Sequence, residues 1–574
     1  MEISISQSDK VKLAVKYCVH KLKLTRILGS EKVGLKTKSG PIMGVQRKTM
    51  YGDKYYSFEG IPFAKPPLGD LRFKSPMPVE PWSKTKNCQK AGPKPLQKHI
   101  FMDMVEGSED CLYLNVYSKN IIPLKPLPVM VWIFGGGFQL GEATRDVHSP
   151  DYFMMEDVVL VVINYRLGPL GFLSLDDPDL RVPGNAGLKD QVMALKWIKD
   201  NCEVFGGDSN NITLFGVSAG SASAHFLMLS NFSKNLFHKV ILMSGTALSP
   251  WALVRPEVRN TNWTQMLVKS MGYCDSDLND KEVFEFLSKA KGKDIIKCCG
   301  NLFGWEERSL REIYAFGPVI EPYTTEDSII TGNPKDIMRN CWSKNIPIMM
   351  GTTSFEGLLL FPEIQKRPEV ITQLKRDCEQ LVPVDLDLST MDIVAEGEKL
   401  RRLHFGKNDP SERTQFEYLD MCSYKYWWHP LYRTLRSRVK HSQASTYLYR
   451  FDFDSKHCNH CRILLCGKKM RGVCHADDLS YIFVNAISSK LKSNSREYKT
   501  MRRMIAILTN FALHGNPNNR EMNEINWEPV DNEKHFNTNA LKCLNISDDL
   551  RIMNFPHQRK LKIWDGVYGD GELV

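Results

Sequence analysis

The stretch "NITLFGVSAGSASAHFLML" constrains this 574-residue chain more than any other. A short β-rich run, residues 212–215, leads into "GVSAG" at 216–220, and a helix-compatible segment rich in Ala, Ser and Leu follows. A strand, a sharp turn and a helix in this order are typical of a nucleophile elbow, in which flanking glycines let strand and helix pass closely while a serine is held at the tip. G-x-S-x-G also occurs by chance in long chains, but the context on both sides favours a nucleophilic Ser218.

A second glycine-rich stretch, "VWIFGGGFQL", occupies residues 131–140. The run 127–134 has the length and β-branched content of a buried strand, and Gly135–Gly137 follow it directly. A phosphate-binding loop would need Lys and Ser/Thr after the glycines, but "FQL" follows instead. A plain tight turn and an oxyanion hole, whose backbone N–H groups receive a developing negative charge, are the remaining interpretations. The oxyanion hole requires a nucleophile elsewhere in the chain, and Ser218 is a candidate.

Composition excludes several classes of protein. Hydrophobic residues make up 42% and charged residues 25% of the chain, as in soluble globular proteins. The longest apolar runs, such as 158–163, are too short to span a bilayer. The formal net charge of +10 is scattered among acids and comes with no zinc-finger or RNA-binding signature, so we expect no nucleic-acid partner.

The N-terminal segment differs from the rest, because six basic residues and no acid lie between Lys10 and Arg26. Possible caps at Ser8 and Asp9 and a stop at Gly29 predict a basic helix within residues 1–30. Residues 10–28 have apolar and basic faces, which suits peripheral contact with an intracellular membrane or a lipid droplet. Packing on the body of the protein is the alternative. Lysines interrupt any secretory signal core, so we expect a cytoplasmic protein that is not secreted and keeps most of its 15 cysteines reduced.

Several long motifs together resemble the carboxylesterase and cholinesterase family. They are "YYSFEGIPFAKPPLGDLRFKSP" from Tyr55, "SEDCLYLNVY" from Ser108, the glycine triplet, "NYRLGPLGFL" from Asn164, "PGNAGLKDQVMALKWI" from Pro183 and the elbow. Within the family the chain is most similar to the insect α-esterases, especially in "HADDLSYIF", "SREYKTM" and "YLYRFDFDS". The resemblance implies an α/β-hydrolase fold, with a large, mostly parallel sheet, helices on both faces and a deep active-site gorge.

The resemblance also assigns the partners of Ser218. The family's acid matches Glu356 in "GTTSFEGLLL", and its base matches His475 in "GVCHADDL". The order Ser, acid, His along the chain is that of α/β-hydrolases. The family's oxyanion donors match the backbone N–H groups of Gly136, Gly137 and Ala219, and each donor of this kind contributes about 10²–10³ in rate.

Four residues are candidates for contact with substrate: Phe134, Val217, Trp251 and Phe355. Phe134 stands where carboxylesterases commonly have His, and Trp251 resembles the acyl-pocket aromatic residue of α-esterases, with an ordinary core Trp as the alternative. Val217 is the larger departure, because most active members have Glu or Gln before the serine. The segment 88–111 also lacks the Trp that receives choline in cholinesterases. These departures favour uncharged acyl esters as substrates and predict reduced turnover.

The cysteines raise two further questions. Cys88 and Cys111 match the family's first disulfide in position, although a cytoplasmic setting would leave them as adjacent thiols. "HCNHC" from His457, followed by Cys466 and Cys474, has the C-x-x-C spacing of a metal site. The second half of a regular zinc motif is missing and His475 is assigned as the base, so we expect no metal there.

We therefore expect a basic helix in 1–30 and a single α/β-hydrolase domain over 31–574. The predicted function is hydrolysis of carboxylic esters, of fatty-acyl or xenobiotic origin, through an acyl-serine intermediate that organophosphates block. The partner is a small-molecule ester, and no metal or organic cofactor is implied. A low-turnover binding protein that sequesters esters is the alternative.

Overall fold

The computed structural model describes residues 31–99, 102–255, 262–273, 278–302, 314–383, 385–386, 392–522, 524–530, 534–538 and 540–569. The basic helix predicted within residues 1–30 lies outside this part of the chain.

One large sheet organises the described residues. Its strands are β1 (Lys32–Thr37), β2 (Gly40–Lys48), β3 (Lys54–Pro62), β4 (Lys86–Asn87), β7 (Tyr113–Ser118), β8 (Leu127–Ile133), β9 (Val159–Ile163), β10 (Gly207–Val217), β11 (Lys239–Met243), β12 (Ile348–Thr353), β13 (Thr446–Phe451), β14 (Lys542–Ile546) and β15 (Leu550–Asn554). They lie in the order β1-β2-β3-β7-β9-β8-β10-β11-β12-β13-β14-β15, and β4 pairs with β2. A separate pair joins β5 (Gln97–Lys98) to β6 (Val105–Glu106).

The centre of the sheet is parallel and its edges are antiparallel. The strands from β9 through β8 to β14 pair in parallel, whereas β1, β2, β3, β7 and β15 form the antiparallel pairs at the edges. The short β4 pairs in parallel with β2. Every residue of β8 and β9 is buried, as the apolar runs at 127–134 and 158–163 predict. A parallel strand covered on both faces reads as a continuous apolar run, which explains the pattern.

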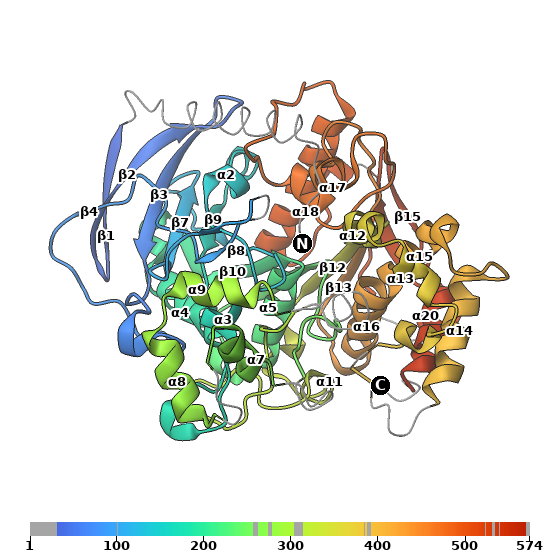
Figure 1. Cartoon of the computed structure of the whole chain (residues 1–574). Helices are drawn as coiled ribbons and strands as arrows, with labels where there is room; N and C mark the ends of the chain where they lie inside the picture. Colours follow the sequence, from blue (N-terminus) through green and yellow to red (C-terminus); the bar gives the residue numbers. More distant parts are fainter. Residues whose placement is uncertain are drawn as a thin grey trace.

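Helices lie on both faces of this sheet and beside it. They are α2 (Arg145–His148), α3 (Gly168–Phe172), α4 (Ala186–Asn201), α5 (Ala219–Leu229), α7 (Trp263–Ser270), α8 (Asp280–Lys289), α9 (Gly292–Cys299), α11 (Pro334–Ile337), α12 (Phe361–Lys366), α13 (Glu369–Gln373), α14 (Ile393–Phe405), α15 (Gln415–Ser423), α16 (His429–His441), α17 (His460–Cys466), α18 (Arg496–His514), α19 (Lys534–Asn537) and α20 (Gln558–Val567). Figure 1 shows α2 and α18 on one face and α4, α5 and α16 on the other. The arrangement agrees with the α/β-hydrolase fold expected from the sequence.

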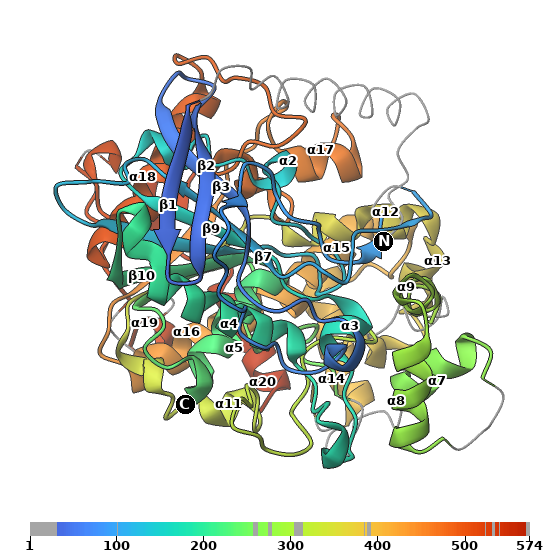
Figure 2. The same ribbon diagram turned by 90° about the vertical axis from the view of Figure 1, so that its left-hand side faces the viewer.

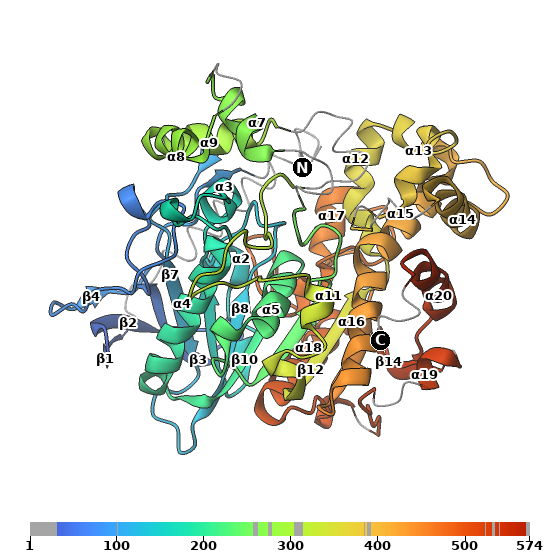
Figure 3. The ribbon, with the colours of Figure 1, turned by 90° about the horizontal axis from the view of Figure 1, so that it is seen from below.

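Two groups of additional helices stand beside the sheet. Figure 2 looks onto the β1 edge and shows α7, α8 and α9 gathered to one side of the strands. Figure 3 shows that this group and the group α12, α13 and α14 lie at the same end of the molecule. No helix among the described residues is long and apolar enough to cross a bilayer.

Candidate active site

Ser218 stands on a strained turn between β10 and α5. Its backbone has φ 55° and ψ −122°, a conformation that L-residues seldom adopt. A Cβ on Gly220 would lie 2.0 Å from the Ile133 oxygen, and one on Gly216 would lie 2.6 Å from the Gly220 carbonyl. The two glycines are therefore needed for β8, β10 and α5 to approach one another. Ser218 is partly exposed, whereas its neighbours Val217 and Ala219 are buried.

Glu356 and His475, which are far apart in sequence, are joined by a short hydrogen bond. The His475 Nδ1 atom lies 2.6 Å from Glu356 Oε2. The other carboxylate oxygen, Oε1, accepts from Ser244 Oγ at 2.5 Å and from the Thr353 N–H at 2.7 Å. Glu356 is fully buried and His475 is 4% exposed. The three donors fix the carboxylate, which in turn holds the imidazole with Nε2 available for proton transfer.

The loop after β11 connects this pair to the elbow. The Ser218 N–H donates to the Met243 carbonyl oxygen. Gly245 lies so close to the elbow that a Cβ on it would be 2.5 Å from the backbone carbonyl oxygen of Ser218. Ser244 lies between Met243 and Gly245 in the sequence, and its hydroxyl donates the hydrogen bond that holds Glu356. Among the described residues, the side chains of Ser218 and His475 form no direct hydrogen bond. Hydrogen bonds between catalytic residues often tighten only when substrate binds.

The glycine triplet packs directly against the elbow. A Cβ on Gly135 would lie 3.1 Å from the Ser218 Cβ and 2.7 Å from the Val217 oxygen. Gly136 and Gly137 have φ of 112° and 61°, and the Gly136 oxygen accepts from the N–H groups of residues 139 and 140. The loop therefore curls beside the nucleophile. The N-terminus of α5, where Ala219 begins the helix, adds the positive end of a helix dipole.

Tyr314 lies against this loop. A Cβ on Gly137 would be 2.1 Å from its phenol oxygen, so the position requires glycine in this structure. Burial raises the pKa of Tyr314 to about 12, which keeps the phenol protonated at neutral pH.

The four candidate substrate residues occupy different surroundings. Trp251 lies beside the elbow, because its Cη2 atom would be 3.1 Å from a Cβ on Gly245, and its Nε1–H donates to the Tyr426 oxygen. Val217 is 3% exposed and its Cγ1 atom faces Gly135. Contact between these side chains and substrate stays a prediction.

Phe134 and Phe355 pack against the loops of the site. The Phe134 ring stacks on Tyr165 with 4.6 Å between centroids and is 1% exposed, so it supports the glycine loop from within the core. The Phe355 N–H donates to the Val473 oxygen, which ties the segment of Glu356 to the segment of His475. Neither ring has an observed contact with the Ser218 side chain among the described residues.

Two further groups surround the base and were not predicted from the sequence. The Trp427 ring lies 5.0 Å from the His475 ring. Asp478 is fully buried, and neither of its oxygens accepts a hydrogen bond of normal geometry from the described residues. Burial, with the negative charge of Glu356, raises the pKa of Asp478 to about 7. The only signal in the sequence was the position of Asp478 within the motif that carries His475.

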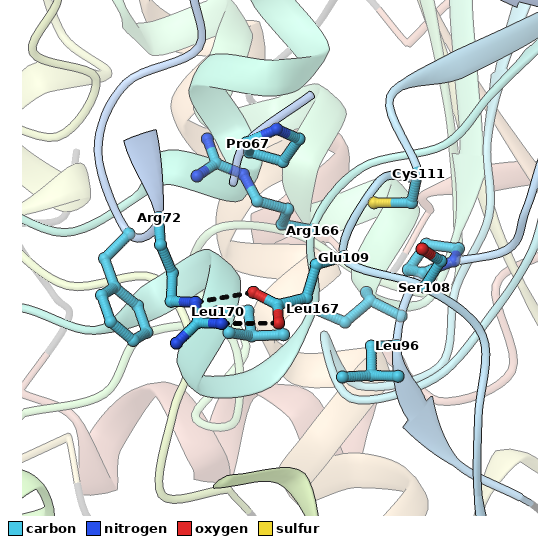
Figure 4. Close-up of a pocket in the computed structure, with 11 residues that line it drawn as sticks. Pro67, Arg72, Leu96, Ser108, Glu109, Cys111, Arg166, Leu167 and Leu170 are labelled. Atoms are coloured by element: carbon cyan, nitrogen blue, oxygen red, sulfur yellow. Dashed lines mark hydrogen bonds and ion pairs between the residues drawn. The ribbon is translucent and has the colours of Figure 1, made fainter. Parts of the chain in front are cut away.

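The disulfide implied for Cys88 and Cys111 is not formed. Both are buried free thiols, and burial raises the pKa of Cys88 to about 12 and that of Cys111 further still. The Cys111 sulfur lines a cavity of about 10 Å³ beside Leu96 and Arg166 (Figure 4). The Cys88 backbone is held between Met43 and Glu59 instead.

The cavity in Figure 4 is separate from the elbow. Its wall includes Arg72, which makes two hydrogen bonds of 2.7 and 2.8 Å to the Glu109 carboxylate. Ser218, Glu356 and His475 are not among the residues that line it. It has room for about one water molecule, too little for a substrate.

The cysteine-rich region that begins with "HCNHC" leads to Cys474, which directly precedes His475. No group of three or more His, Cys, Asp or Glu side chains in the described part of the chain is arranged to hold a metal ion. The Nδ1 atom of His475 is engaged by Glu356.

Comparisons with known proteins agree over most of the chain. A sequence model described as the Carboxylesterase family matches residues 31–564. Esterase B1 of Culex pipiens is 36% identical over 546 residues, which cover 95% of this chain and 99% of that protein. Juvenile hormone esterase of Tribolium castaneum is 34% identical over 521 residues, which cover 87% of this chain and 86% of that protein.

A solved structure is similar as well. Juvenile hormone esterase from Manduca sexta, with OTFP covalently attached, matches with a TM-score of 0.81 and 28% sequence identity. The match covers 94% of this chain and 100% of that one, and it confirms the predicted fold class.

Proposed function

The chain belongs to the carboxylesterase family and is a carboxylic ester hydrolase, and from that premise we propose that it cleaves uncharged esters through an acyl-serine intermediate on Ser218. One observation carries the proposal: three segments meet at the elbow. The glycine triplet packs against Ser218, Ser244 in the loop beside the elbow donates a hydrogen bond to Glu356, and Glu356 in turn holds His475.

The reaction follows from these positions. The Ser218 oxygen attacks the ester carbonyl carbon while His475 Nε2 accepts the hydroxyl proton. Glu356 stabilises the imidazolium that forms, and Gly136, Gly137 and Ala219 donate backbone N–H groups to the carbonyl oxygen as it becomes negative. The tetrahedral adduct collapses, and His475 returns the proton to the departing alcohol. Water then attacks the acyl-serine with His475 as general base, releasing the acid and restoring Ser218.

Val217 supports a preference for uncharged substrates. It places an apolar, buried side chain against Gly135 at the position where a carboxylate would add negative field beside the nucleophile. An ester with a cationic alcohol group finds no carboxylate to pair with at this position. An aliphatic acyl ester carries no charge and does not need one. The natural esters we propose are of fatty-acyl or xenobiotic type.

The same site is proposed to react with organophosphates. Attack of Ser218 on phosphorus expels the leaving group and gives a tetrahedral phosphoryl-serine, whose oxygen receives the same N–H donors. The Manduca sexta relative with OTFP covalently attached is consistent with a reactive nucleophile in this fold.

The test uses the full chain and p-nitrophenyl esters of graded acyl length, followed by titration with a phosphorylating inhibitor and peptide mapping. We expect turnover, one phosphoryl group per chain on Ser218, and loss of both in Ser218→Ala. The exposed Ser493→Ala variant is the matched control and keeps both. Turnover that survives in Ser218→Ala would refute the serine mechanism.

Slow turnover is the basis for the alternative role, a protein that sequesters esters. Val217 is the observation behind it, because its side chain cannot order water near the base as a carboxylate can. If the wild type is acylated or phosphorylated stoichiometrically but releases product slowly, Val217→Glu should raise the deacylation rate. Fast wild-type deacylation would exclude sequestration.

A further inference from the structure

Three thiols gather around the loop that carries the base. Cys461 and Cys466 lie on α17, and Cys474 immediately precedes His475. α17 contacts the segments that carry Glu356 and residues 477–481. The motif that suggested half a metal site is therefore packed onto the proposed catalytic residues.

One carboxylate holds together the two backbone segments that carry Cys461 and Cys474. Asp477 Oδ1 accepts from the Arg462 N–H at 3.0 Å, and Asp477 Oδ2 accepts from the Cys474 N–H at 2.7 Å. Residue 462 directly follows Cys461, so the backbones of the two cysteines are fixed to the same side chain. Burial raises the pKa of Cys474 well above its usual range, and contact with the Cys461 side chain is the next largest cause.

The three thiols differ in access and in partners. Cys474 is fully buried, whereas Cys461 and Cys466 are partly exposed. The Cys466 thiol donates to the Leu358 oxygen at 3.4 Å. Cys461 is thus the partly exposed thiol whose backbone neighbour, Arg462, shares the Asp477 carboxylate with Cys474.

We propose that Cys461 and Cys474 form a peroxide-sensitive dithiol, a modification site whose disulfide moves the catalytic base out of position. This effect on turnover rests on the proposed function, whereas formation of the disulfide does not. The Cys461 thiolate attacks hydrogen peroxide and breaks the O–O bond, giving a sulfenic acid and hydroxide, which takes up the thiol proton as water. The Cys474 sulfur then attacks the Cys461 sulfur, and the hydroxyl leaves with the Cys474 proton as a second water.

Closure of the disulfide acts on His475 through the chain. Formation of the disulfide draws the Cys474 sulfur toward α17 and strains the hydrogen bond from the Cys474 N–H to Asp477. His475 is the next residue, and its ring is aligned by a single 2.6 Å bond to Glu356. We expect kcat to fall roughly 10²-fold, because a misplacement of about 1 Å has that effect on a catalytic group.

The experiment treats the full chain with hydrogen peroxide, blocks remaining thiols, and maps peptides without reduction. The expected result is a peptide pair linked through Cys461 and Cys474, a loss of p-nitrophenyl acetate turnover in step with linkage, and recovery with dithiothreitol. Cys461→Ser should keep turnover and resist peroxide. The partly exposed Cys298→Ser, on α9, is the matched control and should remain sensitive.

The outcomes separate the dithiol from the esterase proposal. Absence of the linked peptide, or its formation with unchanged turnover, would overturn the inference. A wild-type protein without turnover would refute the proposed function. The presence or absence of the linked peptide would then still show whether Cys461 and Cys474 form a disulfide. The pH dependence of kcat/KM gives a second readout, because a displaced base changes the profile while a general loss of folding only lowers its amplitude.

Discussion

The hydroxyl of Ser244 is the residue-scale feature that most clearly connects the nucleophile to the acid. It bonds Glu356 and belongs to the loop that holds Ser218. A hydrogen bond to a charged group contributes about 1.5–3 kcal/mol, so Ser244→Ala should lower kcat by roughly 10- to 100-fold with little change in KM. Steady-state kinetics on a p-nitrophenyl ester measures both. Ser343→Ala, which removes a buried hydroxyl that donates to Met228, is the control, and an unchanged kcat in Ser244→Ala would count against the role.

Asp478 gives a prediction for stability against pH. Its pKa is about 7 in the fold, above the ordinary value of 3.8, so the folded state keeps a proton that the unfolded state releases as the pH rises above 4. The unfolded state then binds fewer protons, and this contribution to stability falls by about 1.4 kcal/mol per pH unit until about pH 7. The stability of Asp478→Asn relative to wild type should therefore rise from pH 5 to 7 and level off above it.

Urea unfolding at pH 5, 6, 7 and 8 tests this trend. Glu398→Gln is the control, because hydrogen bonds from Arg401 hold the pKa of Glu398 to about 2 and its charge is constant over this range. A flat difference for Asp478→Asn would show that Asp478 ionises normally in the fold.

At the scale of elements, the crossing of β8, β10 and α5 decides how Ser218 is presented. Gly220→Ala would place a Cβ 2.0 Å from the Ile133 oxygen, a backbone atom that cannot rotate away. We expect overpacking to cost about 1–3 kcal/mol of stability and the rate of phosphorylation by an organophosphate to fall by more than about 10²-fold, since α5 and its first N–H must shift. Thermal unfolding and inhibition kinetics measure the two effects.

Gly34→Ala is the matched control for that substitution. Its Cβ would be 3.6 Å from the nearest atom, an ordinary contact. Equal effects of the two substitutions would mean that the close approach at Gly220 has no special role.

At the scale of the whole molecule, membrane contact through residues 10–28 is still a prediction, and cytoplasmic location with it. Six basic residues in this segment should favour anionic vesicles over neutral ones, with affinity falling as salt rises. Flotation of the full chain and of a chain lacking residues 1–30 tests this, and we expect only the full chain to float. Equal flotation of both would assign membrane contact to another surface.

Local sequence determined the parts that depend on neighbours along the chain. The apolar runs predicted β8 and β9, and "GVSAG" in its context predicted a strand, a sharp turn and a helix. These features follow from strand burial and from the conformational freedom of glycine within a few residues. The resemblance to a family, rather than any spacing, indicated Glu356 and His475.

The tertiary structure alone decided which groups meet. Ser244 and Glu356 are 112 positions apart, and His475 and Glu356 are 119 apart. Parallel strand order brings β11 beside β12, so the loops after these strands converge on one carboxylate. Tyr314 against Gly137, Trp427 beside His475, the orphaned Asp478 and the joining of the Cys461 and Cys474 segments by Asp477 arise in the same way. Side-chain contacts between distant segments depend on how the whole sheet is ordered and packed, and no local pattern carries that information.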